Sequence, residues 1–140
     1  MSDKYLRFLA RYTINVKDIP NETIHEVKRR IVDSFAVMYP TFHDNTTKPA
    51  KKYAYMFPDP NGSTVFGTNY KTNPEIAGFI NAAMVRYLDF NDTYLSKEPL
   101  HPSDMIRDLF AIAEWKELSD KQLIKAIAYE ICISLRMVRV

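Results

Sequence analysis

The chain has 140 residues, of which 46% are hydrophobic and 26% are charged, a composition typical of one ordinary globular domain. Its 19 basic and 17 acidic residues give a net charge of +2, and the only short basic run is Lys28–Arg30, which argues against a nucleic-acid binder because such proteins carry a basic stripe. The lone Cys132 excludes an intrachain disulfide, and no apolar run reaches the length of about eighteen residues that spans a membrane. The first residues lack the apolar core of a secretory signal, so we expect a cytoplasmic protein.

The first half of the chain is predicted to be helical, with one extended segment. Apolar residues at helical spacing and the positions of the prolines define these elements. They are a short helix over 5–12, a helix over 22–38 capped by Asn21, a polar loop over 41–49, a short helix over 51–56, and a strand over 63–67. Because one strand makes no sheet, we expect the last segment to be a hairpin fragment or an extended connector.

Three more helices are predicted in the second half. Asn73 and Pro74 begin the first of them, with Asn81 on its outer side. Ser103 and Asp104 are expected to cap the next helix, which runs to Trp115, and a capping box at 119–122 begins the last, which runs to the C-terminus. The sequence therefore predicts an all-α fold of five or six helices in a single domain, residues 1–140, with at most a short hairpin or extended segment near residues 63–68.

Reactive side chains concentrate around the connection between the first two of these three helices. Arg86 and Asp89 are three residues apart, so they can pair or face a cleft together. Asp92 and Thr93 follow the predicted helix end, and His101 precedes the next helix. Two helix ends meeting at this connection would bring a carboxylate, a hydroxyl and an imidazole together, which suits proton transfer beside an anionic substrate.

Simpler interpretations exist for each of these residues. Arg86 and Asp89 are compatible with a solvated surface pair, Asp92 and Ser103 with turn and cap residues, and His101 with an ordinary loop residue. A metal site is disfavoured, because His43–Asp44 lacks a third ligand at usable spacing. Cys132 lies among apolar residues and is expected to be a buried, inert thiol.

The motif Leu88–Tyr94 followed by His101–Asp104 resembles the signature of the MmgE/PrpD family. That family contains 2-methylcitrate dehydratases, cis-aconitate decarboxylase and iminodisuccinate epimerase. Segments from Leu9–Tyr12 to Lys125–Ile131 follow the family's order, so the resemblance covers essentially the whole chain. The loop between the two motif halves, with Tyr94–Leu95 and Glu98, is more similar to the 2-methylcitrate dehydratase branch.

The resemblance implies a role for each motif residue. The catalytic positions of the family match Asp89, Thr93 and His101, with His101 as the proton-transfer group. The substrate-binding region is expected to include Arg86 beside the carboxylates of a tricarboxylate substrate, with Asn91, Asp92 and Ser103 orienting the loop. The resemblance implies no metal and no cofactor, and members of this branch need no iron–sulfur cluster.

Full members of the family are much longer, with a second α/β domain that supplies a lysine and a histidine to the active site. The chain is therefore expected to be the N-terminal part of a longer two-domain enzyme, a homodimer, that is inactive without the remainder. Several alternatives stay open on the sequence alone. They are a non-catalytic helical interaction module, one subunit of a two-chain lyase, and another family activity such as cis-aconitate decarboxylation or epimerisation.

Overall fold

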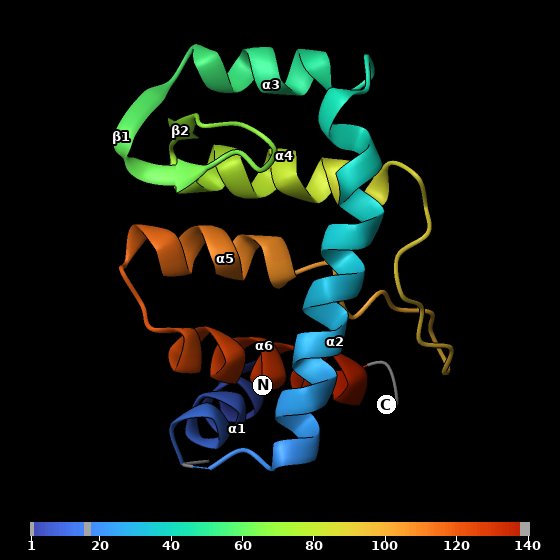
Figure 1. The fold of residues 1–140 in the computed structure, drawn as a ribbon. Coiled ribbons are helices and arrows are strands. Elements are labelled where there is room, and N and C mark those ends of the chain that lie inside the picture. Colours follow the sequence, from blue (N-terminus) through green and yellow to red (C-terminus); the bar gives the residue numbers. More distant parts are fainter. Residues whose placement is uncertain (1, 16–17, 138–140) are drawn as a thin grey trace.

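The computed structural model describes residues 2–15 and 18–137, and its elements are labelled in Figure 1. In chain order they are α1 (Ser2–Asn15), α2 (Asn21–Met38), the 3-10 helix η1 (Tyr39–His43), α3 (Lys48–Tyr55), β1 (Pro58–Thr64), β2 (Lys71–Thr72), α4 (Pro74–Arg86), α5 (Ile106–Trp115) and α6 (Asp120–Met137). None of the helices in this part of the chain is long and apolar enough to cross a membrane.

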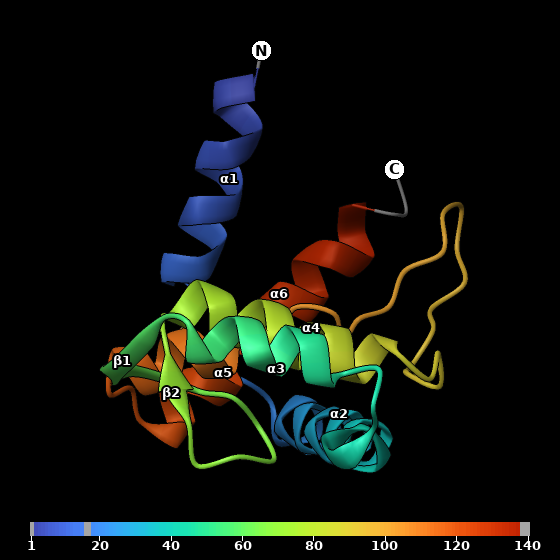
Figure 2. The same cartoon turned by 90° about the horizontal axis from the view of Figure 1, so that it is seen from above.

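Four helices form a stack that α2 crosses. Figure 1 shows α3, α4, α5 and α6 one below another, with α2 running across them, and α2 contacts both α4 and α6. Figure 2 shows α1 projecting from this stack on the same side as the C-terminal end of α6. The hydroxyl of Tyr12 lies 3.2 Å from the sulfur of Cys132, and the ring of Tyr12 packs edge-on against Tyr129. Cys132 is thus half-buried against α1, less enclosed than the sequence predicted.

The fold is mainly α rather than all-α, because it contains a small antiparallel hairpin. The prediction allowed a short hairpin near residues 63–68, but the strand predicted over 63–67 lies earlier, as β1. β1 pairs with β2, with Ser63 opposite Thr72 and Thr64 opposite Lys71. The missed partner strand has only two residues, too few to show a period-2 pattern. Gly62 is required for the pairing, because a Cβ at this position would lie 2.0 Å from the carbonyl oxygen of Thr72.

Asn81 joins the hairpin to α4 and lies on the buried side of that helix, opposite to the prediction. Its side-chain amide nitrogen donates to the carbonyl of Thr64 at 3.1 Å, and its oxygen accepts from the amide of Phe66 at 2.9 Å. The side chain is fully buried. The sequence predicts the outer side because polar side chains are usually solvated. Burial of Asn81 is possible because the hairpin supplies both of the hydrogen-bond partners that a buried amide needs.

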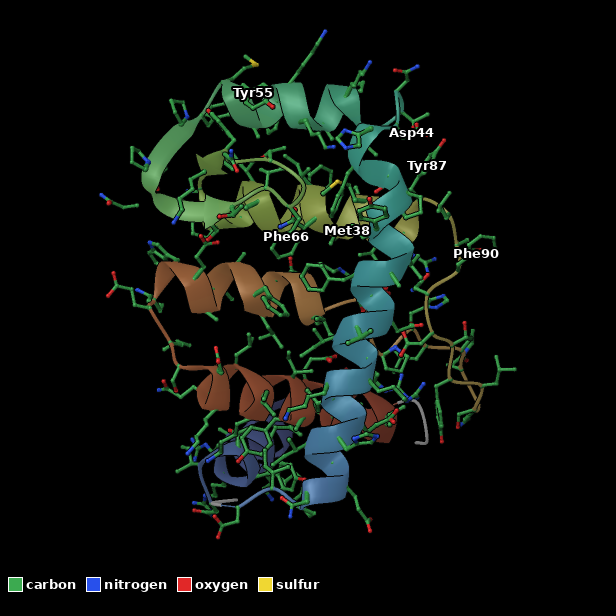
Figure 3. All side chains as sticks on the ribbon, in the orientation of Figure 1. Met38, Asp44, Tyr55, Phe66, Tyr87 and Phe90 are labelled. Atoms are coloured by element: carbon green, nitrogen blue, oxygen red, sulfur yellow. The ribbon has the colours of Figure 1, made fainter. Side chains whose placement is uncertain are left out.

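The apolar core consists of two clusters. The upper cluster joins α2, α3, α4 and the residues that directly follow β1, and Figure 3 labels two of its side chains, Met38 and Phe66. Its fully buried members are Met38, Ala54, Val65, Ile80, Met84 and Val85. The lower cluster joins α2, α5 and α6 through Val27, Ile106, Ile127 and Ala128. Because α2 contributes to both clusters, it fixes the positions of α4, α5 and α6 relative to one another.

The observed helix starts allow each predicted N-terminal cap to be checked. Asn73 caps α4 by accepting from the amide of Glu75 at 2.9 Å, and the box between Ser119 and Gln122 precedes α6, with 2.9 Å between the Ser119 amide and the Gln122 side-chain oxygen. Both predictions are confirmed. The caps predicted at Asn21 and Ser103 are wrong, because α2 already begins at residue 21 and α5 begins only at residue 106, each without a side-chain cap.

One loop boundary also differs from the prediction, and one helix end is untested. The predicted loop over 41–49 contains the end of η1 and the start of α3. Its polar residues satisfy main-chain groups locally, as when the hydroxyl of Thr47 donates to the carbonyl of Thr41 at 2.9 Å. The predicted extension of the last helix over residues 138–140 lies outside the described residues.

Candidate active site

The segment between α4 and α5, residues 87–105, carries the sequence-predicted site and is called the α4–α5 loop below. Figures 1 and 2 show this loop and the hairpin at opposite ends of the helix stack. The loop turns at Asp89, whose φ of 53° is in the left-handed region that aspartate tolerates better than most residues. Further along, Tyr94 and Leu100 form an isolated antiparallel bridge, with N–O distances of 2.8 and 3.0 Å. This bridge brings the residues next to it, Thr93 and His101, opposite each other.

His101 is anchored through one nitrogen of its ring. Its Nδ1 lies 2.8 Å from the main-chain carbonyl oxygen of Asp92 and 3.3 Å from the hydroxyl oxygen of Thr93. The imidazole is half-buried, whereas Thr93 is exposed. The structure therefore brings together the imidazole and the hydroxyl that the sequence placed at this site.

The carboxylate of Asp92 is occupied by two donors. Oδ1 accepts from the main-chain amide of Ser103 at 3.0 Å, and Oδ2 accepts from the guanidinium of Arg30 on α2. These contacts join the two ends of the α4–α5 loop to each other and to the long helix. The hydroxyl of Ser103 is buried and has no hydrogen-bond partner among the described residues.

Arg86, Asp89 and Asn91 form a second group at the end of α4. Nη2 of Arg86 pairs with Oδ1 of Asp89 at 3.4 Å, and Nη1 donates to the side-chain oxygen of Asn91 at 2.9 Å. The side chain of Asp89 is 75% exposed and that of Arg86 39% exposed, so this cation is accessible to solvent. Asn91 is buried, and its amide nitrogen reaches Oδ1 of Asp104 at 3.5 Å. Phe90, by contrast, lies on the outer side of the loop (Figure 3).

Sequence reasoning missed two arginines that hold the loop. Arg30 was noticed only as part of a short basic run, and its pairing with Asp92 depends on the packing of α2. Arg107 is 2% exposed, and its guanidinium donates to the main-chain carbonyls of Ser103 and Asp104. A basic residue one turn after a predicted helix start was a weak signal, because nothing in the sequence indicated that it is buried.

Burial shifts the ionisation of groups behind the loop. It lowers the pKa of Arg107, although the nearby Asp104 opposes the shift. Burial also raises the pKa of Glu130 on α6, whose Oε1 accepts from the hydroxyl of Ser134 at 2.7 Å. Within residues 2–15 and 18–137, no three His, Cys, Asp or Glu side chains gather as a metal ion would require. The exposed face of the site thus offers an imidazole, a hydroxyl, and a solvent-accessible guanidinium paired with a carboxylate.

Comparison with known proteins identifies the family of the chain that carries this loop. The MmgE/PrpD N-terminal domain matches residues 7–139, nearly the whole chain. The chain belongs to the MmgE/PrpD family. Among curated relatives, the 2-methylcitrate dehydratases of Cupriavidus necator and Escherichia coli K12 are each 41% identical over 90 residues, which cover 54% of this chain and 19% of each enzyme. An alkylcitrate dehydratase of Talaromyces stipitatus is 28% identical over 122 residues, covering 81% of this chain and 24% of that enzyme.

The match to these dehydratases covers only a part of each of them. This MmgE/PrpD chain spans between about a tenth and a quarter of the length of the curated relatives it matches. The match to the family domain over residues 7–139 confirms the resemblance that the sequence indicated. The activity and the substrate remain matters for proposal.

Proposed function

We propose that this MmgE/PrpD chain is the N-terminal part of a hydro-lyase that eliminates water from a tricarboxylate of the 2-methylcitrate type. The names of the curated relatives support the reaction class. The observation that carries the chemistry is the anchored imidazole of His101, 3.3 Å from the hydroxyl of Thr93 on the bridged loop. A carbonyl oxygen only accepts hydrogen bonds, so the 2.8 Å contact with Asp92 requires a proton on Nδ1 and leaves Nε2 of the neutral ring as a proton acceptor.

Water elimination needs such an acceptor. A base removes the proton from the carbon next to a carboxylate, the electron pair of that C–H bond forms the new double bond, and the hydroxyl leaves with a proton as water. In this proposal Nε2 of His101 takes the carbon-bound proton, with Thr93 and Asp89 as the other catalytic residues of this chain. Arg86 binds a substrate carboxylate, since a guanidinium pairs with carboxylates in a fixed planar geometry.

The loop's remaining polar residues have a supporting role in the proposal. Asn91, Asp92 and Ser103 are held by hydrogen bonds within the loop, so they orient the residues that meet the substrate. The remainder of the enzyme supplies the other catalytic groups, and the chain alone is inactive. The proposal also includes a cytoplasmic homodimer with a role in propionate catabolism, as the resemblance to the 2-methylcitrate dehydratase branch implies.

A chimera tests the proposal. The 140 residues replace the matching part of the Escherichia coli dehydratase, and formation of the double bond from 2-methylcitrate is followed by absorbance. The chimera should turn over, the 140-residue chain alone should not, and His101→Ala in the chimera should lower kcat at least 100-fold, because general acid–base groups contribute about 10²–10⁴. His43→Ala is the matched control, since His43 is an exposed histidine on η1.

Three results would contradict the proposal. A folded chimera that dehydrates no tricarboxylate refutes the reaction class, and His101→Ala with turnover within a few-fold of the parent refutes the role of the imidazole. Dehydration by the isolated chain would show that its site is complete. Assays with cis-aconitate in parallel separate dehydration from decarboxylation.

A further inference from the structure

Arg30 on α2 contacts the α4–α5 loop from far away in the sequence, through an ion pair with Asp92. The main-chain carbonyl of Asp92 is the group that holds His101. The guanidinium of Arg30 donates through Nη1 to Oδ2 of Asp92 and lies 2.9 Å, through Nε, from Oε1 of Glu26. The side chains of Arg30 and Asp92 are only 19% and 16% exposed. Partial burial weakens solvent screening, so this pair is stronger than an ordinary surface ion pair.

Asp92 uses three oxygens at once. Both carboxylate oxygens are engaged, one by Arg30 and one by the amide of Ser103, and the main-chain carbonyl accepts from Nδ1 of His101. Fixing both ends of the carboxylate fixes the rotamer of Asp92 and limits rotation of its backbone. The carbonyl therefore keeps its direction toward the imidazole.

The direction of that carbonyl decides which nitrogen of His101 is reactive. In a neutral imidazole one nitrogen carries the proton and the other accepts, and the partner of the first selects the tautomer. The hydroxyl of Thr93, at 3.3 Å from the same nitrogen, does not select a tautomer because it can either donate or accept. Among the contacts of His101 within the described part of the chain, the carbonyl of Asp92 is the one that imposes the Nδ1–H form.

We propose that Arg30 is a positioning residue that, through Asp92, holds His101 in the Nδ1–H tautomer and presents Nε2 to the substrate. The inference rests on the proposed function for the catalytic use of Nε2. The tautomer itself is a property of the chain and can be measured without substrate.

Nitrogen NMR of the histidine rings tests the inference directly. The chain has three histidines, so 15N-histidine labelling gives three ring systems, with His25 and His43 as internal references. At about pH 8, where histidine is ordinarily neutral, His101 of the parent should carry its proton on Nδ1. In Arg30→Gln, which keeps most of the apolar stem, the His101 signals should shift toward a mixture of the two tautomers.

Arg29→Gln is the matched control. Arg29 is the neighbouring arginine on α2, and its guanidinium donates to the same Glu26 rather than to the loop, from a side chain that is 61% exposed. This variant should keep the parent tautomer, and Arg30→Lys, which retains the positive charge, should largely restore it. If Arg30→Gln fails to fold, Asp92→Asn removes the same ion pair and should give the same mixture. An unchanged Nδ1–H signal in Arg30→Gln or Asp92→Asn, or an Nε2–H signal in the parent, overturns the proposal.

Turnover of the chimera separates this inference from the proposed function. Arg30→Gln should lower kcat by up to about 100-fold, as expected for small misplacement of a reacting group, while KM changes by less than a few-fold and Arg30→Lys recovers most of the rate. An inactive parent chimera in which Arg30→Gln still alters the tautomer refutes the dehydratase and supports the positioning. An active chimera in which Arg30→Gln changes neither the tautomer nor kcat refutes the positioning alone.

Discussion

Replacing Arg107 with alanine should loosen the turn at residues 102–105 and destabilise the whole domain. The guanidinium donates to the carbonyls of Ser103 and Asp104, the latter at 2.6 Å, in a site where Arg107 is 2% exposed. Without it the half-buried carbonyl of Asp104 loses this donor, whereas the buried carbonyl of Ser103 keeps the amide of Ile106 at 3.2 Å. A buried group left unpaired costs about 1–3 kcal/mol. Removing a buried cation also returns part of the free energy spent in burying it, consistent with the lowered pKa of Arg107. The net expectation is a loss of about 2 kcal/mol in the free energy of unfolding.

Urea unfolding of Arg107→Ala and Arg107→Met measures this loss. The methionine variant keeps an apolar stem but removes the same two hydrogen bonds, so it should lose less stability than the alanine variant and still be less stable than the parent. Arg29→Ala is the matched control, because it removes the same charge from a side chain that is 61% exposed and pairs with Glu26 on the same helix, so the free energy of unfolding should change little.

Hydrogen exchange adds a local measurement. The amide of Ser103 donates to Oδ1 of Asp92 at 3.0 Å, so it should exchange faster in Arg107→Ala by more than the global loss of stability explains. The reasoning is refuted if Arg107→Ala is no less stable than Arg29→Ala. It is also refuted if Arg107→Met is more stable than the parent, since burial of the charge would then outweigh its hydrogen bonds.

Two further predictions concern the packing and the pH dependence of the domain. A Cβ at Gly78 would lie 2.5 Å from Oδ1 of Asp108, so Gly78→Ala should destabilise the parent protein by about 1 kcal/mol. In the Asp108→Ala background the clash is absent, and Gly78→Ala should stabilise the protein by up to about 1 kcal/mol because alanine has the higher helix propensity. Equal effects in both backgrounds would contradict this prediction. Burial raises the pKa of Glu130 in the folded protein. The protonated carboxyl therefore contributes its full stability below the pKa of the unfolded chain, about 4.3, and this contribution is lost as the pH rises through the higher pKa of the folded protein. The stability of Glu130→Gln relative to the parent should therefore increase from pH 4 to about pH 7 in chemical denaturation, and a constant difference would refute the assignment.

Local signals in the sequence were sufficient for much of the helical architecture. Asn73 followed by proline, and serine and glutamine three residues apart at 119–122, satisfy helix amides with neighbouring side chains, so these helix starts need no tertiary contact. The spacing of apolar residues likewise predicted α2 to within one residue, because one face of that helix is buried. The motif residues Thr93 and His101 could be named from the sequence, since both lie in the connection between the same two predicted helices.

What the sequence could not decide depends on partners distant along the chain. Asn81 is buried because the hairpin supplies its hydrogen bonds. Ser103 lies in a turn before α5, which begins only at Ile106, and its amide and carbonyl are held there by Asp92 and Arg107. Arg30 reaches the loop only because α2 packs against both α4 and α6. Sequence patterns report propensity and periodicity, which are local, whereas the pairing of buried polar groups is set by which elements the apolar clusters bring together. The sequence by itself determined the helices and the residues of the candidate site, and the tertiary structure alone decided how those residues are held.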